Sequence, residues 1–157
     1  MDISIRRAVE ADLPVIQALA SGLLNYEREN FDSSLDANWT FSEEAKKKYL
    51  VAINEKYTII AENDGEPVGY LIGKIFSTPA DSARVIKQAM LENIFVNAEL
   101  RGSGIGQKLI QKFLDYCRSE GVDRVNVSVL AKNENTIKFY EKTGFLPRSL
   151  NLSMELK

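Results

Sequence analysis

The chain has 157 residues, enough for one domain with its own core, and its 45% hydrophobic and 27% charged residues are ordinary for a globular protein. The formal net charge of −2 gives no general attraction to a polyanion, so we expect no nucleic-acid partner. The sequence has no histidine and one cysteine, which excludes Ser-His and Cys-His catalytic pairs, an intrachain disulfide and His- or Cys-cluster metal sites, so no metal is expected.

Periodicity and turn residues divide the chain into seven predicted strands and four predicted helices. Asp12, followed by Leu13 and Pro14, is typical of a helix N-cap with proline in the first turn, and Asn63-Asp64-Gly65 predicts a hairpin. The order predicts a mixed α/β fold. In chain order, the predicted elements are a strand at 3–7, a helix at 13–24, a loop or broken helix at 26–40, a helix at 42–54, strands at 57–61 and 67–78, a loop at 78–82, a strand at 87–96, a glycine-rich turn at 100–106, a helix at 105–117, a strand at 125–129, a helix at 133–142, and strands at 145–148 and 150–156.

All apolar stretches are far shorter than the roughly 20 residues that span a bilayer. Met1–Arg7 alternates polar and apolar residues and is not the start of a secretory signal. No linker or repeat divides residues 1–157. We therefore expect a single domain in a cytoplasmic protein with no membrane partner.

The sharpest motif is the glycine-rich turn at 101–106, Arg-Gly-Ser-Gly-Ile-Gly, which follows a predicted strand and opens a predicted helix. Glycines let the backbone approach a ligand closely, and amide N–H groups at a helix N-terminus favour a pyrophosphate, to which Arg101 and Lys108 would add charge. Gln107 stands where a dinucleotide-binding motif has its third glycine, and Lys108 does not follow glycine as in a P-loop. A glycine-rich connection without a ligand is the alternative.

Two stretches resemble the GNAT superfamily of acyl-CoA N-acyltransferases. The pattern R-x-x-G-x-G after Ile-Phe-Val lies in Ile94–Gln107, and N-x-x-x-x-x-F-Y-x-x-x-G-F lies in Asn133–Phe145. Arg7, Ala8 and Asp12 at the start, and the order of the predicted elements, agree with the same family. The resemblance implies a mostly antiparallel sheet of about seven strands, flanked by about four helices and splayed between its two central strands, in an N-acetyltransferase that uses acetyl-CoA.

The resemblance also implies where coenzyme A lies. In that family its pyrophosphate rests on the glycine-rich turn, and its pantetheine arm runs beside the preceding strand, where the strands holding Ile94 and Val127 part. Asn133 would contact the cofactor through its side chain, and its alternative role is the N-cap of the next helix. Besides Arg101, the implied cofactor-binding residues are Ile94, Phe95, Val96, Gly102, Ser103, Gly104, Ile105, Gly106 and Gln107.

Tyr140 matches the family tyrosine that acts as general acid and protonates the leaving thiolate. Its alternative role is a core aromatic, since Ile137 and Tyr140 share a helical face. Cys117 lies on an apolar helical face and has no histidine to activate it, so we expect a buried structural cysteine. Direct attack by the amine in a ternary complex is therefore predicted.

Glu92 is the predicted base. Alternation places it on one strand face with Ile94 and Val96, and we expect these apolar neighbours to raise its pKa. In the spermidine/diamine acetyltransferase branch a glutamate stands at this place in L-E-x-x-x-V, which Leu91, Glu92 and Val96 match. The alternatives are a water chain as the base and a glutamate that pairs with a basic residue.

Charge is unevenly distributed along the chain. Residues 1–100 carry 16 acidic and 10 basic side chains, a net of −6, whereas residues 101–157 carry 6 acidic and 10 basic ones, a net of +4. By resemblance the first part supplies the acceptor side, where an acidic mouth would attract a cationic amine. A solvated acidic loop is the alternative. Candidate residues of this mouth are Tyr26, Glu27, Glu29, Phe31, Asp32, Asp36 and Trp39.

The sequence therefore predicts an acetyl-CoA-dependent N-acetyltransferase. Its acceptor is the primary amine of a small or polyamine-like molecule, or an amino group of a peptide or protein. An acyl-CoA-binding sensor without turnover is the alternative from another class, and the presence of both Tyr140 and Glu92 argues against it. A homodimer is a further expectation, since members of the family are often dimers.

Overall fold

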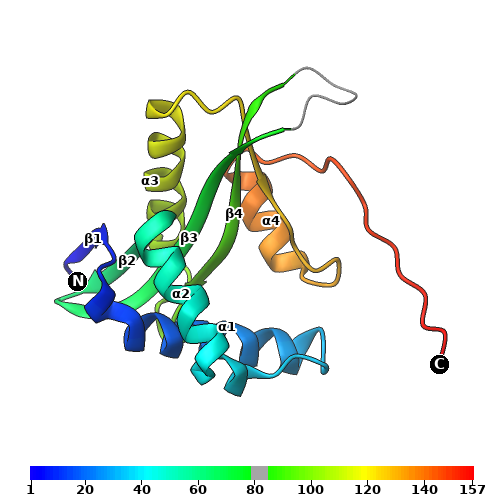
Figure 1. Ribbon diagram of the computed structural model, residues 1–157, viewed down its shortest axis with the longest axis horizontal. Helices are drawn as coiled ribbons and strands as arrows, with labels where there is room; N and C mark the ends of the chain where they lie inside the picture. Colours follow the sequence, from blue (N-terminus) through cyan, green and yellow to red (C-terminus); the bar gives the residue numbers. More distant parts are fainter. Residues whose placement is uncertain (79–84) are drawn as a thin grey trace.

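A five-stranded sheet forms the centre of the computed structural model, which describes residues 1–78 and 85–157 (Figure 1). The strands lie in the order β1-β2-β3-β4-β5, in which β1 to β4 pair antiparallel and β4 and β5 pair parallel. The predicted mixed, mostly antiparallel sheet with four helices is confirmed for the described residues. The elements are β1 Ile3–Arg7, η1 Glu10–Asp12, α1 Leu13–Asn30, η2 Ala37–Phe41, α2 Glu43–Glu55, β2 Tyr57–Asn63, β3 Glu66–Ser77, β4 Lys87–Val96, η3 Ala98–Leu100, α3 Ile105–Ser119, β5 Arg124–Val127 and α4 Glu134–Lys142.

Two apolar cores lie on opposite faces of the sheet. On one face, Ile16 of α1 and Ile53 of α2 pack in one cluster with Ile60 and Tyr70 of the sheet. On the other face, α3 packs closely because β3 has a glycine there: a Cβ at Gly73 would lie 2.3 Å from the ring of Phe113. The two clusters thus place α1 and α2 against one face and α3 against the other, and Figure 1 shows these helices around the long strands β3 and β4.

Cys117 lies in the α3-side core, with 2% of its surface exposed. Burial raises the pKa of its thiol to about 11, so the side chain stays in the unreactive thiol form at neutral pH. The predicted buried position of this cysteine is confirmed.

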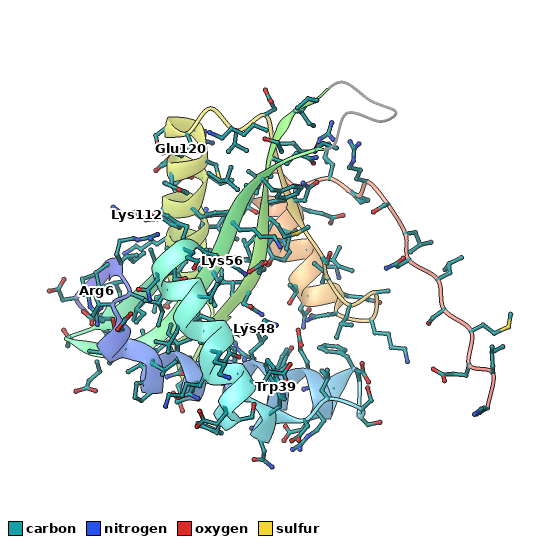
Figure 2. All side chains as sticks on the ribbon, viewed as in Figure 1. Arg6, Trp39, Lys48, Lys56, Lys112 and Glu120 are labelled. Atoms are coloured by element: carbon teal, nitrogen blue, oxygen red, sulfur yellow. The ribbon has the colours of Figure 1, made fainter. Side chains whose placement is uncertain are left out.

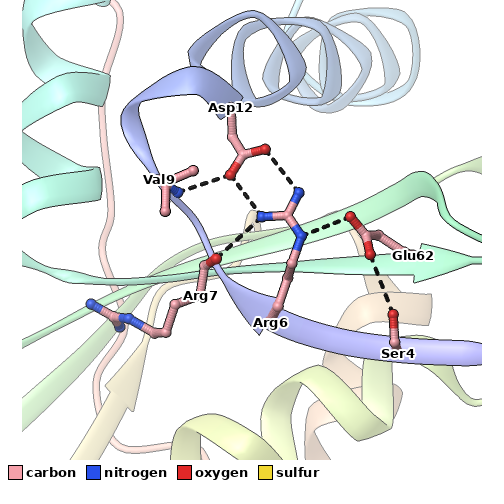
Figure 3. A network of polar contacts seen from close by, with 6 residues as sticks. All are labelled: Ser4, Arg6, Arg7, Val9, Asp12 and Glu62. Carbon is pink, nitrogen blue, oxygen red and sulfur yellow. Dashed lines mark hydrogen bonds and ion pairs between the residues drawn. The ribbon is translucent and has the colours of Figure 1, made fainter.

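A network of polar contacts fastens β1 to the start of α1 (Figure 3). Arg6 donates two hydrogen bonds of 2.8 Å to the carboxylate of Asp12, which also accepts from the N–H of Val9 at 2.8 Å. Arg6 Nε lies 2.8 Å from Oε1 of Glu62 in β2. Asp12 is the N-cap residue of α1, with Pro14 in the first turn as predicted, but its side chain accepts no bond from the helix because these partners occupy its oxygens. The Arg6 guanidinium holds the pKa of Asp12 below its usual value.

Helix α1 is longer than predicted and runs to Asn30. The loop expected from residue 26 therefore begins later, because Tyr26 continues the helical spacing of Leu19 and Leu23. Other ends agree with local signals. Ser42 caps α2, and a two-residue turn with positive φ at Asp64 and Gly65 joins β2 to β3. None of the described helices is long and apolar enough to cross a membrane.

The prediction of seven strands is wrong, because the described residues form five. The two predicted strands at 145–148 and 150–156 have no regular structure, although residues 150–156 alternate apolar and polar side chains. A strand needs a hydrogen-bonded neighbour, and none lies beside these residues within the described ranges. Residues 146–157, which we call the arm, are all exposed and run away from the sheet (Figure 1). Of the loop predicted at 78–82, residues 79–82 lie outside the described residues.

Candidate active site

A cavity of about 600 Å³ lies where β4 and β5 part. The two strands pair as far as Leu91 opposite Val127. Residues 92–96 and 128–130, which follow on the two strands, line the cavity. The predicted parting of the strands that hold Ile94 and Val127 is thus confirmed, but β5 is an edge strand of the described sheet, so these are not its two central strands. The remaining walls come from the middle of α1, the glycine-rich turn with the first turn of α3, and α4 with the residue before it.

A β-bulge in β4 marks where the parting begins. Asn93 pairs with Ile72 and Leu91 pairs with Gly73, which leaves Glu92 as an extra residue in β4. A bulge bends its strand and increases the local twist, so the ladder with β5 ends beside it. Beyond the bulge, one edge of β4 has no strand partner within the described residues. Its backbone groups suit an extended ligand that carries amides.

The glycine-rich turn offers backbone donors at the start of α3. Gly104, the residue before the helix, has a φ of 85° that favours glycine. The first helical hydrogen bond runs from Lys108 N–H to Gly104 O at 3.0 Å, so the amides before Lys108 have no helical acceptor. Ser103 differs from prediction: its N–H donates to Leu100 O at 3.3 Å, and it does not line the cavity. The other predicted turn residues do line it, namely Arg101, Gly102, Gly104, Ile105, Gly106 and Gln107.

Arg101 joins the turn to α1. Its guanidinium lies over the rings of Tyr26 and Phe95, at 4.4 and 5.5 Å from their centroids, and its Nε donates to Val96 O at 3.3 Å. These contacts hold a positive charge at the cavity wall beside the unbonded amides, where an anion is favoured. Lys108, the second predicted charge, lines a separate hollow beside β1 instead.

Asn133 is 5% exposed and lines the cavity. Its Oδ1 accepts a hydrogen bond from Thr136 N–H at 3.2 Å, so the predicted N-cap role is confirmed. Its Nδ2 has no hydrogen-bond partner among the described residues. The amide group thus keeps a donor for a ligand, and its contact with a cofactor stays a prediction.

Tyr140 on α4 is 5% exposed and lines the cavity. Its ring packs between Phe139 and Phe145, with centroids 5.5 and 5.4 Å away. Its hydroxyl makes no hydrogen bond within the described residues. Burial, and then the charge of Glu27, raises the pKa of Tyr140, so the side chain remains a phenol with a proton to donate.

Glu92 lines the cavity, but its surroundings differ from prediction. Lys56 Nζ lies 2.7 Å from Oε2 and Lys74 Nζ lies 2.8 Å from Oε1. Although burial opposes them, the hydrogen bonds from these lysines lower the pKa of Glu92, so the expected rise is wrong. The bulge is the reason: Ile94 and Val96 pack in the α3-side core, while Glu92 meets Lys56 at the end of α2, on the other face.

Glu27 is the second carboxylate at the cavity. It forms no ion pair within the described residues. Burial, and then the charge of Asp32, raises its pKa above the usual glutamate value. The cavity therefore has one carboxylate neutralised by lysines and one that is not. In the described residues, no group of three or more His, Cys, Asp or Glu side chains could hold a metal ion.

The predicted acceptor-side residues are only partly brought together. Tyr26 lines the cavity, whereas Glu29 and Phe31 do not, and Phe31 packs edge-on against Tyr26 at 5.7 Å. Trp39 packs against Tyr49 at 6.4 Å and beside Lys48 (Figure 2), away from the cavity lining. Spacing in the sequence does not separate these aromatics: Tyr26 lies on α1, whereas Trp39 lies in η2 and packs against Tyr49 of α2.

Sequence reasoning missed Phe139, which lines the cavity beside Tyr140. A Cβ at Gly106 would lie 3.3 Å from the ring of Phe139, so α4 packs against the first turn of α3 at this glycine. The pair Phe139-Tyr140 and the third glycine of the turn are both visible in the sequence. Their contact, however, joins two separate helices, so no local signal reveals it.

Comparison with known proteins gives a family match and related acetyltransferase sequences. Residues 22–145 match the model of the Acetyltransferase (GNAT) family. Thialysine N-epsilon-acetyltransferase of Sus scrofa is 30% identical over 152 residues, which cover 90% of this chain and 83% of that protein. An uncharacterised N-acetyltransferase of Methanocaldococcus jannaschii is 31% identical over 109 residues, 69% of this chain. The match spans only 45% of that relative's length.

Solved structures agree on the fold. PaiA N-acetyltransferase from Thermoplasma acidophilum, solved in complex with coenzyme A, superposes with a TM-score of 0.79. The match covers 96% of this chain and 94% of that one, at 19% sequence identity. At this identity the likeness establishes the fold alone.

Proposed function

This chain belongs to the GNAT family of acetyltransferases, and we propose that it transfers the acetyl group of acetyl-CoA to the primary amine of a small cationic molecule. The observation that carries the proposal is the cavity between β4 and β5, which joins unbonded turn amides at one wall to a buried phenol and a carboxylate at others. An acyl donor and an amine acceptor can meet in such a space.

The residues of the cavity fit acetyl-CoA. The unbonded amides before Lys108 and the charge of Arg101 suit a pyrophosphate, and the edge of β4 beyond the bulge suits the amides of a pantetheine chain. Asn133 would hold the cofactor through its Nδ2. When bound, acetyl-CoA supplies the acetyl group as a thioester. Holding donor and acceptor together is itself a source of rate, up to roughly 7–11 kcal/mol in favourable cases.

Tyr140 is proposed as the general acid. Its raised pKa keeps the phenolic proton in place at neutral pH, and its hydroxyl has no competing partner among the described residues. A phenol beside a departing thiolate can protonate the sulfur and so avoid an unsolvated negative charge. The buried Cys117 has no place in this scheme, because its side chain lies in the α3-side core. Direct attack by the amine remains the proposed route.

The side of the cavity that carries Glu27 and Glu92, which we call the acidic wall, is proposed to bind the acceptor amine. Glu27 lines the cavity without an ion-pair partner in the described part of the chain, so it can hold an ammonium group of the acceptor. Glu92 or a water beside it is proposed to receive the proton that the attacking amine loses. Because Lys56 and Lys74 hold both Glu92 oxygens, the lysines would weaken it as a base.

A thiol-release assay tests the proposal. Acetyl-CoA is mixed with the protein and with amines that carry a second cationic group, such as spermidine and thialysine, and free thiol is measured over time. We expect turnover with these amines, and less turnover with amines that carry an acidic group near the nitrogen that is acetylated. Binding of acetyl-CoA in a calorimeter without thiol release for any amine would identify a sensor instead of an enzyme.

A further inference from the structure

Two primary amines of the chain itself lie on the carboxylate that is proposed to receive the proton of the acceptor. Lys56 Nζ is 2.7 Å from Glu92 Oε2, and Lys74 Nζ is 2.8 Å from Oε1. Neither lysine makes another ion pair within the described residues. An acceptor amine has to come within hydrogen-bond reach of the same oxygens to give up its proton. The chain thus places amines of its own where the reaction needs a substrate.

The acetyl group would lie close to these amines. The glycine-rich turn follows the end of β4, and residues 92–96 of β4 line the cavity between this turn and the bulge. A donor whose pyrophosphate rests on the turn, and whose pantetheine arm follows this edge, would hold its thioester at the bulge end of the cavity. The thioester and the two lysine amines would then meet at Glu92.

The two lysines differ in their freedom to move. Lys74 lies on β3, where it pairs with Met90 of β4, and its side chain is 45% exposed. Lys56 is the C-cap residue of α2, and its side chain is 22% exposed. A lysine stem has four flexible carbons, so an amine that is little covered can change partners. Lys74 is therefore the amine that can leave Glu92 and enter the cavity, while Lys56 keeps the charge of Glu92 paired.

We propose that the protein acetylates its own Lys74 with acetyl-CoA, within one chain, when no other acceptor is bound. Self-acetylation rests on the proposed function, because it uses the same donor, the same base and the same acid. An acetylated lysine carries no charge, so the modification would also release Oε1 of Glu92 from its ion pair.

The atoms and charges of this step balance. Lys74 starts as an ammonium group and gives one proton to Glu92 Oε1, which it already contacts. The freed electron pair of the nitrogen forms a bond to the carbonyl carbon of the thioester, and the C–S bond breaks with its electrons on the sulfur. Tyr140 protonates the sulfur and is reprotonated by the second proton that the nitrogen loses. The products are an amide, a thiol and one proton, which Glu92 releases to water.

Mass spectrometry of the full chain tests the proposal. The protein is incubated with acetyl-CoA that carries a ¹³C-labelled acetyl group, without any amine, so acetyl groups gained during expression are not counted. Lys48, an exposed lysine of α2 away from the cavity lining, reports the uncatalysed reaction. We expect Lys74 to be labelled at least ~100-fold faster than Lys48, the lower end of general acid–base catalysis. The rate per molecule should not depend on protein concentration.

Variants connect the labelling to the site. Glu92→Gln removes the base, so the labelling of Lys74 should fall to about the rate of Lys48. Lys74→Arg keeps a cation beside Glu92 but has no lysine amine, so the chain should gain label only at the uncatalysed rate. Lys48→Arg is the matched control, because it makes the same exchange at an exposed position away from the cavity lining, and Lys74 should be labelled as before. Added spermidine should slow the labelling, because it competes for Glu92.

The outcomes separate self-acetylation from the proposed function. Thiol release with an added amine, but labelling of Lys74 no faster than that of Lys48, would overturn self-acetylation and leave the proposed function standing. No thiol release with any amine and no labelling would overturn both. Label on Lys56 in place of Lys74, labelling that persists in Glu92→Gln, or a rate that rises with protein concentration would each overturn the proposed step.

Discussion

The two sides of the cavity use opposite means to hold a charged ligand. On the side of α3, the donors are backbone amides that lack acceptors because a helix begins there, with Arg101 beside them. On the side of α1 and β4, the groups are the carboxylates of Glu27 and Glu92. The positions of the backbone donors are fixed by the fold, whereas the pKa of each carboxylate depends on the residues around it. Lysines lower the pKa of Glu92, and burial raises that of Glu27.

The comparison teaches that two glutamates at one cavity need not serve the same purpose. Glu92 is held between Lys56 and Lys74, so it contributes a neutralised group that also joins α2 to β3. Glu27 has no ion-pair partner among the described residues and burial raises its pKa, a combination that is typical of a group at a functional site. Variants of residues on both sides of the cavity test this difference.

The largest effect is expected from Tyr140→Phe, which removes the proposed proton donor between the two walls. We expect kcat to fall by roughly 10²–10⁴-fold, the range of general acid catalysis, while the dissociation constant of acetyl-CoA changes little. Steady-state thiol release gives kcat, and calorimetry gives the binding. Equal turnover in the two proteins would remove Tyr140 from the mechanism.

The next largest effect is expected at the glycine-rich turn, whose backbone amides form the wall of the cavity on the side of α3. Gly104→Ala forces a side chain into a φ of 85°, which costs roughly 1–2 kcal/mol and displaces the turn, so acetyl-CoA should bind about tenfold more weakly. Gly121→Ala is the matched control, since Gly121 also has a positive φ of 68° but follows the far end of α3. It should lose similar stability and keep its affinity. Equal loss of affinity in both variants would contradict a specific role for the turn.

On the acidic wall, Glu27→Gln should raise the KM for a dicationic amine about fivefold and leave kcat nearly unchanged, because one ion pair with the acceptor is lost. Glu29→Gln removes the same charge from the same helix at an exposed position away from the cavity. It should behave like the unchanged protein. A similar KM in the two variants would assign the acceptor site to other residues.

The smallest effects are expected in stability, with opposite signs for the two carboxylates. The pKa of Glu92 is lowered by folding, so its ionised form stabilises the fold above pH 4.5 and this contribution is lost as the pH falls. Glu92→Gln should therefore cost about 0.5–1 kcal/mol at pH 7 and nothing in acid. The pKa of Glu27 is raised, so its ionisation costs stability, and Glu27→Gln should not destabilise at pH 7. Urea unfolding at several pH values measures the free energy of unfolding of both variants. A loss of stability at pH 7 in both variants would contradict the opposite pKa shifts of the two carboxylates.

Local and family signals in the sequence were sufficient for much of the fold and for part of the site. Ser42 and Asp64-Gly65 act through their immediate neighbours, so a helix start and a hairpin could be predicted. The two motifs around Gly104 and Tyr140 both contribute residues that line the cavity. The lysine partners of Glu92 could not be found, because Lys56 lies 36 residues away and a bulge changes the face on which Glu92 lies.

The same limit explains the strand count. Residues 150–156 have the pattern of a strand as clearly as residues 124–127 do, and only the latter have a neighbour to pair with in the described chain. Alternation of apolar and polar residues indicates that a segment can pack on an apolar surface, but it does not predict which surface or neighbouring strand the segment contacts.

The bulge in β4 amounts to one surplus residue. If Glu92 were deleted, Leu91 and Asn93 would become consecutive, their pairing with Gly73 and Ile72 would be regular, and every later side chain would keep its present face. What would vanish is the bend, and β4 would then follow β5 past Val127 and fill the gap. The cavity between β4 and β5 thus depends on one extra residue in β4, and we expect deletion of that residue to narrow the cavity while most of the side chains that line it keep their faces.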